Sequence, residues 1–324
     1  MNKINNILGR KTGVALITVI LIISILVAAS LELNRSSRSD VSAAFNISEG
    51  LQLNYIAKSG FYAAAALLVD AKQDYETLRD DWAQTEVVSA RSKNYFDHGH
   101  FLVKIDDEKG KIPVNKLVNG SVVDENIKEI LLRLLKLPEF KLEDSRAEEI
   151  VDAMIDWMDD NEEITGKGAE SSYYASLNPS YTAKNAQLDC IEELLMIKGI
   201  TSELFSGTSE KPGLGKYLTI YGTGAISINT APKMVLRALA PDISVEMADK
   251  MDEYRKQSGT DLSSAEWYKK VSGMGEITIK PELIEVAKSN FFLIQATGIS
   301  GKMEQRINVV MQRAPFQILS WRQD

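Results

Sequence analysis

An uncharged apolar segment near the N-terminus constrains this chain more than any other feature of its sequence. Residues 14–31 contain no acidic or basic side chain and consist mainly of Leu, Ile, Val and Ala. As an α-helix they would span roughly 27 Å, close to the thickness of the hydrocarbon core of a bilayer. Lys3, Arg10 and Lys11 precede the segment, and basic residues favour the cytoplasmic side of a membrane. The sequence therefore predicts one membrane-spanning helix, with the bulk of the chain across the membrane.

Three kinds of N-terminal segment fit this pattern. The first is a plain membrane anchor. The second is a secretory signal peptide, because the small residues before Ser30 would allow cleavage after Ala29. The third is a leader that is cut after Gly13, which would leave the apolar helix at the start of the mature protein. We favour the third, since residues 31–71 contain no proline and apolar residues recur there at helical spacing.

Strand-forming segments occur at both ends of the remaining chain. Residues 101–105 and 111–114 flank one turn, and residues 290–296 and 305–311 flank another. We expect these segments to form an antiparallel sheet that packs on the N-terminal helix. A sheet whose strands come from both ends implies that the residues between them are an insertion. The predicted fold class is therefore α+β.

The intervening residues contain an internal repeat. Ile-Pro-Val-Asn at 112–115 resembles Ile-Ser-Ile-Asn at 226–229, and Leu-Arg-Leu-Leu at 132–135 resembles Leu-Arg-Ala-Leu at 236–239. The repeat predicts two small helical units in tandem. Later matches have a different offset, so the first unit carries about 23 extra residues within 157–188.

The extra residues of the first unit are strongly acidic. Carboxylates this close repel one another, and a hard cation, which takes roughly six to eight oxygen ligands, would relieve that repulsion. The spacing does not match an EF-hand, because Ile164 stands where that loop needs glycine. These residues alone leave both a solvated acidic loop and a cation site open. The acidic stretch consists of Asp156, Asp159, Asp160, Asn161, Glu162, Glu163 and Glu170, around Gly166 and Gly168.

The composition argues against catalysis and against nucleic acid as a partner. The formal net charge is −8, which disfavours contact with a polyanion. The single cysteine, Cys190, is expected to be a small buried side chain, and the histidines are His98 and His100. This pair could hold a metal, but zinc would need further ligands that nothing nearby supplies. We find no nucleophile–base pair, and we therefore expect no enzyme.

A DNA-binding protein is the strongest competing interpretation. Residues 236–250 and 196–201 each resemble a helix-hairpin-helix motif, in which backbone amides of glycines hold phosphate groups. The hairpin tips at 241–244 and 198–201 lack the pair of glycines that lets a backbone approach a phosphate. We therefore interpret both hairpins as structural.

Three short motifs point to a known family. Gly-Val-Ala-Leu-Ile-Thr-Val at 13–19 is similar to the processing site of pilin-like proteins, with Val14 as the first mature residue. Thr18 stands at the fifth mature position, where most such proteins carry glutamate. Asp-Trp-Met-Asp at 156–159 and Gly-Ala-Glu-Ser-Ser-Tyr-Tyr at 168–174 complete the set. Together these motifs resemble the K-type minor pseudopilins of bacterial type II secretion systems, the general secretion pathway protein K family, in which the missing glutamate is habitual.

Thr18 has a physical explanation in that setting. A carboxylate inside a bilayer is costly and needs a partner, which the family picture supplies from a neighbouring subunit. A subunit that enters a filament first has no such neighbour, whereas Thr18 can bond its hydroxyl to its own helix backbone. The alternative is that Thr18 is one tolerated polar residue of an anchor.

The resemblance implies a fold and a division of the chain. The fold is a long N-terminal helix packed on an antiparallel sheet, with a large inserted helical domain of two SAM-like, or helix-hairpin-helix-like, units. The expected parts are a prepilin leader (1–13), the transmembrane part of the helix (14–33), a helix-plus-sheet domain (34–118 and 286–324) and the inserted domain (119–285), whose units cover about 119–215 and 225–285.

The resemblance also implies a structural function. A prepilin peptidase would cut after Gly13, methylation of Val14 would follow, and the chain would stay in the inner membrane with its bulk in the periplasm. With I-type and J-type minor pseudopilins it would cap or initiate the pseudopilus tip, beside the major pseudopilin, for protein export across the outer membrane. The alternatives are a helix-hairpin-helix DNA-binding membrane protein and a plain membrane-anchored periplasmic protein.

Calcium is the cofactor that the resemblance implies. In that family the acidic region of the helical domain binds calcium, and the matching positions are Asp159, Asn161, Glu163 and Glu170. The role of the ion would be structural, because it would close a loop that is too polar to fold onto an apolar core.

Overall fold

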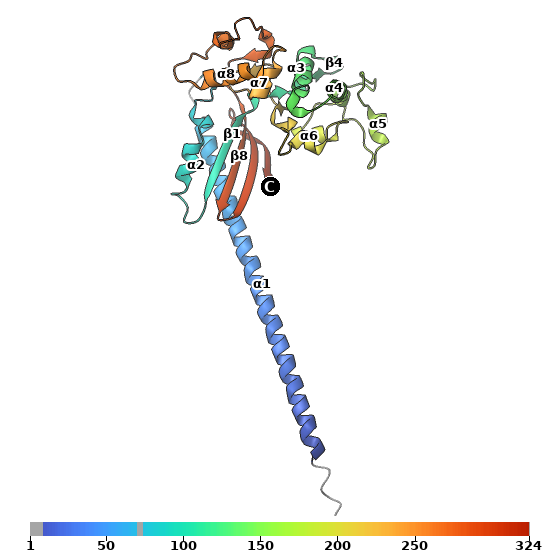
Figure 1. Cartoon of the computed structure of the whole chain (residues 1–324), viewed down its shortest axis with the longest axis vertical. Coiled ribbons are helices and arrows are strands. Elements are labelled where there is room, and N and C mark those ends of the chain that lie inside the picture. The colour runs from blue at the N-terminus through green and yellow to red at the C-terminus, as the bar shows by residue number, and fades with distance from the viewer. Residues whose placement is uncertain (1–8, 70–73, 324) are drawn as a thin grey trace, which may run out of the picture.

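A single long helix, α1 (Gly9–Val69), sets the shape of the molecule (Figure 1). The computed structural model describes residues 9–69 and 74–323, so residues 1–8 of the expected leader lie outside the described part. No proline interrupts α1, and the helix runs unbroken from its apolar half to the sheet. Among the described helices, α1 alone is long and apolar enough to cross a membrane by length and composition.

Four antiparallel strands form the sheet, in the order β1-β8-β9-β10. Burial alternates along β1 and β8, as expected for a sheet with one covered face, and the covered residues of β8 include Phe292, Ile294 and Ala296. The prediction of a sheet built from both ends of the chain on the N-terminal helix is confirmed. The strands are β1 (His100–Asp107), β8 (Phe291–Ser300), β9 (Met303–Gln312) and β10 (Gln317–Gln323).

The last third of α1 packs against the covered face of the sheet. Ala57, Phe61 and Leu68 are fully buried there, and small residues let the helix approach the strands closely. At Gly298 of β8, a Cβ atom would lie 2.4 Å from the carbonyl oxygen of Leu53, so only glycine fits. The short turn η1 (Asp81–Ala83) closes the end of this core with Trp82. This packing fixes α1 as a rigid stalk beneath the sheet.

The inserted residues form a helical domain above the sheet (Figure 1). It has one continuous apolar core, which is larger than the core between α1 and the sheet. Its helices are α3 (Glu125–Leu135), α4 (Asp144–Met158), α5 (Ser171–Ala175), α6 (Ser202–Ser206), α7 (Lys233–Ala238) and α8 (Val245–Lys256), with a hairpin of β3 (Val118–Asn119) and β4 (Val122–Val123) and the 3-10 turns η3 (Val114–Lys116), η4 (Pro138–Phe140), η5 (Ile191–Met196), η6 (Leu214–Lys216), η7 (Ala265–Lys270) and η8 (Pro281–Leu283).

The internal repeat appears as two units that close in the same way. In the first, β2 (Ile112–Pro113) pairs in parallel with β5 (Leu218–Thr219). In the second, β6 (Ile226–Ser227) pairs in parallel with β7 (Ile284–Glu285). Each unit therefore begins and ends on a two-residue parallel ladder, and its helices lie between the two strands.

One strand pairing differs from the expectation. Residues 111–114 were expected to return along 101–105, but β2 turns away from β1 after the 3-10 turn η2 (Glu108–Gly110). The reason is apolar burial, since Ile112 and Val114 are fully buried in the core of the helical domain. The change of core therefore lies between Asp107 and Ile112, ahead of the predicted boundary at residue 118.

Buried polar groups join the helical domain to the sheet. Asp107, at the end of β1, accepts hydrogen bonds from Thr230 (2.7 Å) and from Ser289 (2.8 Å). Arg313, just after β9, forms a buried ion pair with Glu76 at 2.6 Å. The bond from Thr230 joins the two domains, and the ion pair fixes the segment that follows α1 to the end of β9. Both contacts are maintained because a buried charge is costly unless it keeps its partners.

Candidate metal centre and membrane anchor

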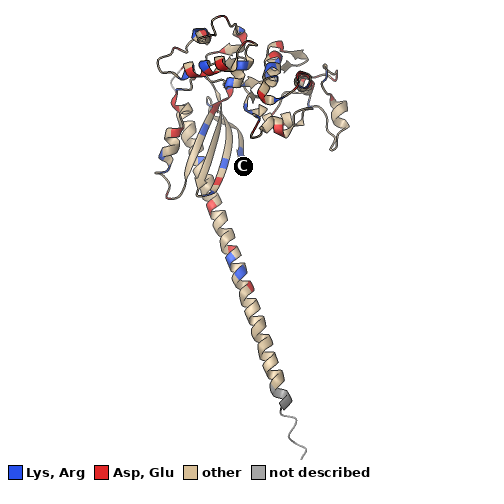
Figure 2. Cartoon of the chain, viewed as in Figure 1, with Lys and Arg blue, Asp and Glu red and all other residues tan. Residues whose placement is uncertain are grey.

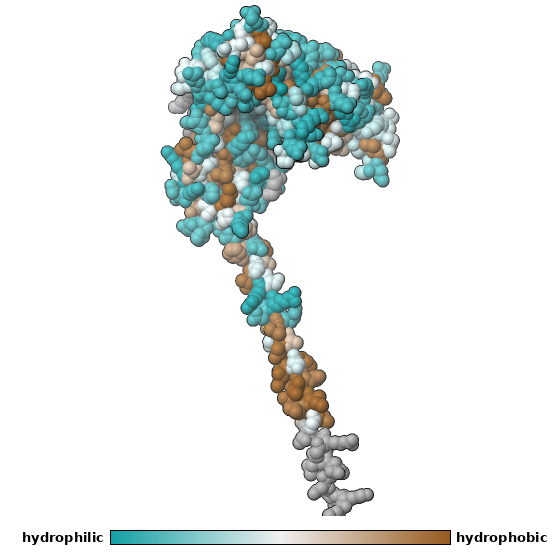
Figure 3. Space-filling view, in the orientation of Figure 1, coloured by the Kyte–Doolittle hydropathy of each residue, from teal (hydrophilic) through white to brown (hydrophobic). Residues whose placement is uncertain are grey.

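The apolar segment of α1 is exposed along its whole length. Its apolar window is not buried by any part of the described chain, and Figure 3 shows it as a brown band below the globular part. The next charged residues along the helix are Glu32, Arg35 and Arg38. Figure 2 shows a short group of acidic and basic residues on the helix between the apolar segment and the sheet. A helix of this kind needs lipid or neighbouring helices to cover it.

The three residues predicted to matter for processing and assembly lie on this helix. Gly13 and Val14 are helical and exposed. The hydroxyl of Thr18 donates to the carbonyl oxygens of Val14 (2.8 Å) and Ala15 (2.9 Å). Thr18 thus satisfies its polar group within its own helix, as expected, and brings no unpaired donor into the apolar segment.

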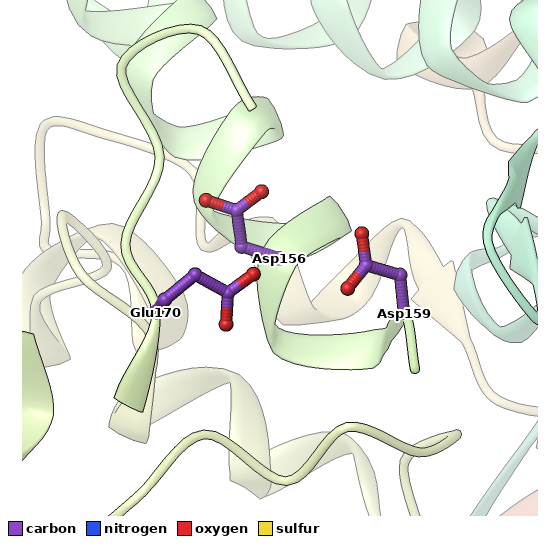
Figure 4. A group of neighbouring side chains, drawn as sticks. All are labelled: Asp156, Asp159 and Glu170. Atoms are coloured by element: carbon purple, nitrogen blue, oxygen red, sulfur yellow. The ribbon is translucent and has the colours of Figure 1, made fainter. Parts of the chain in front are cut away.

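Three buried carboxylates meet at the end of α4 (Figure 4). Asp156 lies in the last turn of α4, Asp159 follows that helix directly, and Glu170 precedes α5. Their exposed fractions are 0%, 3% and 1%, and one oxygen from each lies within 4.8 Å of the others. Among the described residues, they alone form a group of acidic, histidine or cysteine side chains that could hold a metal ion.

The loop between α4 and α5 folds back over its own helix to bring Glu170 to the two aspartates. Consecutive Asx turns start it: the Asp159 carboxylate accepts from the Asn161 backbone N–H (3.4 Å), and the Asn161 side chain accepts from Glu163 (2.7 Å). Gly168 then crosses α4 so closely that a Cβ atom would lie 2.1 Å from a carboxylate oxygen of Asp156. Glycine at this position is therefore a steric requirement of the cluster.

Several oxygens of the cluster lack hydrogen-bond donors. Asp156 accepts from the backbone N–H of Thr165 at 2.9 Å through one oxygen, but its other oxygen is buried and unpartnered. Both oxygens of Glu170 are also buried and unpartnered. Native proteins rarely leave such atoms without partners, because an unpaired buried polar group costs about 1–3 kcal/mol or more.

Burial and mutual repulsion disfavour the charged forms of these groups. Burial, followed by the negative charges of Asp156, Asp159 and Glu162, raises the pKa of Glu170 to about 7. The pKa values of Asp156 and Asp159 are also raised, chiefly by burial. The arrangement can therefore either take up protons or bind a cation, and a hard divalent cation prefers such carboxylate oxygens.

The predicted ligands separate into two groups in the structure. Asp159 and Glu170 belong to the buried cluster, whereas Glu163 is exposed and Asn161 is half-buried and uses its side-chain oxygen in the turn. Asp156 was not among the predicted ligands. The signal for it was present, because residues three apart on a helix share a face and Asp156 precedes Asp159 by that spacing.

The cysteine and histidines do not form a site. Cys190 is exposed, contrary to the expectation of a small buried side chain, because it lies on the surface loop before η5. Its backbone N–H donates to Glu193 at 3.2 Å. His98 is exposed and His100 is half-buried at the start of β1.

Comparisons of sequence give one consistent family. Residues 110–208 match the family model described as type II secretion system (T2SS), protein K. Type II secretion system protein K of Aeromonas hydrophila is 25% identical over 208 residues, which is 61% of each chain. The corresponding protein of Klebsiella pneumoniae is 29% identical over 205 residues, or 60% of each chain. The match thus spans about three-fifths of the length of these relatives.

The fold has a solved counterpart. The crystal structure of the GspK-GspI-GspJ complex from the enterotoxigenic Escherichia coli type 2 secretion system contains a chain that superposes with a TM-score of 0.65. The superposition covers 86% of this chain and 98% of that one at 16% sequence identity, a likeness that shows the fold. With the matched domain and the sequence relatives, it leads to one conclusion: in its fold and over the matched residues, this chain is similar to type II secretion system protein K.

Proposed function

We propose that this protein is a minor pseudopilin of a type II secretion system. The observation that carries the proposal is the unbroken helix α1, which joins an apolar, membrane-length segment to a pilin-like sheet. The family match adds the secretion system to that architecture. The role is structural: the protein binds other subunits through α1 and its folded domains, and it transforms no substrate.

The apolar half of α1 supports processing after Gly13. Cleavage there by a prepilin peptidase, followed by methylation of Val14, leaves the membrane segment on the mature protein. The protein then sits in the inner membrane by a single span, with its folded part in the periplasm. Thr18 suits a subunit that enters the assembly first, since its hydroxyl needs no neighbour.

The place proposed for the protein is the tip of the pseudopilus, with I-type and J-type minor pseudopilins beside it and the major pseudopilin below. The similar solved structure is named as a complex of GspK with GspI and GspJ. The bulk of the helical domain, which lies on the side of the sheet away from the membrane segment (Figure 1), favours the tip, because it leaves little room for a subunit above.

Mass determination of the mature protein from isolated inner membranes tests this proposal. We expect a polypeptide that begins at Val14 and carries one added methyl group. Loss of the gene should stop secretion, and the wild-type chain should restore it. A mature chain that begins at Ser30 and is free in the periplasm would exclude a pseudopilin.

We also propose that Asp156, Asp159 and Glu170 hold a calcium ion. The unpartnered oxygens of Asp156 and Glu170 support the proposal, because a cation would satisfy them and cancel the repulsion that raises the pKa of Glu170. The ion would be structural, since it would tie the loop before α5 to the end of α4. Asn161 and Glu163 would then act on the turn that positions Asp159.

A further inference from the structure

The two edges of the sheet are treated differently by the chain. Along β1, helix α2 (Glu86–Ser92) and the residue before it cover the outer edge with hydroxyl groups. Ser92 accepts from the backbone N–H of Phe101 at 3.1 Å, and its hydroxyl proton is shared between the carbonyl oxygens of Phe101 (3.1 Å) and Ser89 (2.6 Å). Ser89 accepts from the N–H of Val103 at 3.1 Å, and Thr85 donates to its carbonyl at 2.6 Å. No main-chain group of Phe101 or Val103 is left for another strand.

The opposite edge, β10, has no such cover. In antiparallel sheets the main-chain groups of successive residues point to alternate sides, and the bond from Arg313 N–H to the Asn290 carbonyl (2.7 Å) sets the phase for β8 and β9. Met311, Val309 and Ile307 of β9 therefore point their N–H and C=O groups toward β8. Their partners on β10, which are Ile318, Trp321 and Gln323, point their N–H and C=O groups away from the sheet. The same rule directs Phe101 and Val103 of β1 outward, where their bonds to α2 are observed.

No bond from the described part of the chain satisfies the outward groups of β10, and no described strand follows β10 in the sheet. Figure 1 shows this edge, which ends at the C-terminus, free on the side of the sheet opposite α2. An edge with unpaired N–H and C=O groups is a template for a further strand.

The structure nevertheless holds β10 in place. Arg322 forms an ion pair with Glu192 of the helical domain, and the ring of Trp321 packs edge-on against Phe61 of α1 at 5.3 Å. A bulge at Leu319 interrupts the ladder with β9. The strand is therefore a fixed, preorganised edge, which lowers the ordering cost of docking onto it.

A set of exposed apolar and aromatic side chains, here called the strip, lies on β10 and on the turns of α1 around Lys58, whose ammonium group approaches Trp321 of β10. Ile318 is 39% exposed, and Tyr55 and Tyr62 of α1 are 68% and 61% exposed. Lys58 lies between the two tyrosines in sequence, with its ammonium group 5.9 Å from the ring centroids of both Tyr55 and Trp321. No carboxylate of the described chain pairs with Lys58. The strip thus matches an apolar element that carries an acidic side chain.

From these features we infer that β10 docks an edge strand of a partner pseudopilin, which extends the sheet and places an acidic residue near Lys58. The inference rests on the proposed function, because it takes the partner from the tip assembly. A strand is the occupant that satisfies the outward groups of Ile318, Trp321 and Gln323. The guarded edge at β1 leaves β10 as the open side for such an addition.

Hydrogen exchange measured by mass spectrometry tests the inference on the full chain in detergent micelles. The probe is the I-type minor pseudopilin of the same secretion system, with and without the J-type. In the chain alone, the amides of Trp321 and Gln323 should exchange quickly. In the complex, their exchange should slow by roughly tenfold or more, while the amides of Phe101 and Val103 stay unchanged.

A pair of variants separates strand addition from other contacts. Ile318→Lys combined with Gln323→Pro places a charge on the edge and removes an outward N–H, both of which edges tolerate. Partner affinity should fall by roughly tenfold or more, with thermal unfolding unchanged. Leu102→Lys, an exposed position of the guarded strand β1, is the matched control and should leave affinity unchanged.

The outcomes distinguish the inference from the proposed function. A complex that forms without protection at β10, or that the double variant does not weaken, overturns the strand docking and leaves the minor pseudopilin role intact. Failure of the wild-type chain to bind either partner overturns both. Protection that grows with the concentration of the chain alone indicates self-pairing, and it also overturns the inference.

Discussion

At the scale of single residues, the most informative groups are carboxylates that the fold buries. Asp107 is buried at the domain joint but keeps hydrogen-bond donors from Thr230 and Ser289. Glu170 is buried as deeply and has no donor for either oxygen. Asp107 is therefore a structural carboxylate whose desolvation is offset by hydrogen bonds. The desolvation of Glu170 is not offset by any such bond, so Glu170 needs a further partner.

Replacement of Glu170 by glutamine tests the calcium proposal. Without calcium, Glu170→Gln should unfold at a higher temperature than the wild type, because the variant removes a repelling, desolvated charge. Calcium should raise the melting temperature of the wild type. In the variant, the affinity for calcium should fall about tenfold or more. Differential scanning fluorimetry with calcium or with a chelator measures both effects.

Glu163→Gln is the matched control, since Glu163 is an exposed carboxylate on the same loop. Its melting temperature should respond to calcium as the wild type does. Equal calcium responses of the wild type and Glu170→Gln would remove Glu170 from the site.

Asp107 predicts a pH dependence of stability. Burial, opposed by hydrogen bonds from Thr230, Ser289 and Lys109, raises its pKa from 3.8 to about 6. The folded state therefore binds the proton more tightly than the unfolded state. The stabilisation is full below pH 3.8 and is lost as the pH rises to about 6. The loss is of the order of 3 kcal/mol.

Asp107→Asn should remove this dependence. The difference in unfolding free energy between the wild type and the variant should change between pH 4 and pH 6 and then stay constant, as urea unfolding at several pH values can show. Parallel profiles for the two proteins would contradict a raised pKa of Asp107.

At the scale of elements, hydroxyl side chains replace a missing strand. Helix α2 cannot extend the sheet, yet Ser89 and Ser92 satisfy main-chain groups of β1 as a neighbouring strand would. The helix thereby closes one edge of the sheet against aggregation and strand exchange. The two edges of the sheet therefore differ, because β1 is covered by α2 and β10 is not.

Ser92→Ala tests the closure of that edge. The substitution leaves the N–H and carbonyl groups of Phe101 buried without these bonds, and unpaired buried groups cost about 1–3 kcal/mol. The free energy of unfolding should fall by that amount, as measured by denaturant titration of the full chain in micelles. Ser42→Ala on the exposed part of α1 is the control and should change stability by less than about 0.5 kcal/mol. An equal effect of both variants would contradict the role of α2.

At the scale of the whole molecule, polar groups of the segment that follows α1 join the sheet to the helical domain, and the carbonyl oxygen of Glu76 accepts from the side chain of Asn229 at 3.2 Å. Arg313 and Glu76 are 6% and 1% exposed, and they connect the end of β9 with the segment that follows α1. Nearby, Arg79 donates to the carbonyl oxygens of Gln257 (2.9 Å) and Thr260 (3.1 Å) in the helical domain. A rigid joint of this kind lets the stalk set the position of the helical domain.

Arg313→Ala should loosen the segment that follows α1, which carries the contacts to the helical domain. It leaves the Glu76 carboxylate buried without its ion-pair partner, and the expected loss of stability is about 3–5 kcal/mol. Arg306→Ala, which removes an exposed arginine with a loose 3.8 Å ion pair, should cost less than about 1 kcal/mol. Thermal unfolding measures both variants, and comparable losses would contradict a special role for the buried pair.

Local patterns were enough to predict much of the fold. The uncharged residues 14–31 required a membrane-length helix, and strand-forming residues on both sides of a turn marked β8 and β9. The two-fold repeat predicted tandem helical units, and the structure shows both closing on a parallel ladder. Each of these features depends on residues close in sequence or on a repeated pattern, so the chain itself displays it.

Tertiary packing alone decided the remaining features. The pairing of Ile112 with Leu218 joins residues far apart in sequence, and no local pattern distinguishes it from a return along β1. The meeting of Asp156 with Glu170 depends on how the loop folds back across α4 at Gly168. Propensity and periodicity act between neighbours, whereas burial and desolvation depend on everything that surrounds a group in space. The sequence by itself therefore determined the long apolar helix, the sheet and the repeat, and the tertiary structure decided the carboxylate cluster and the open edge.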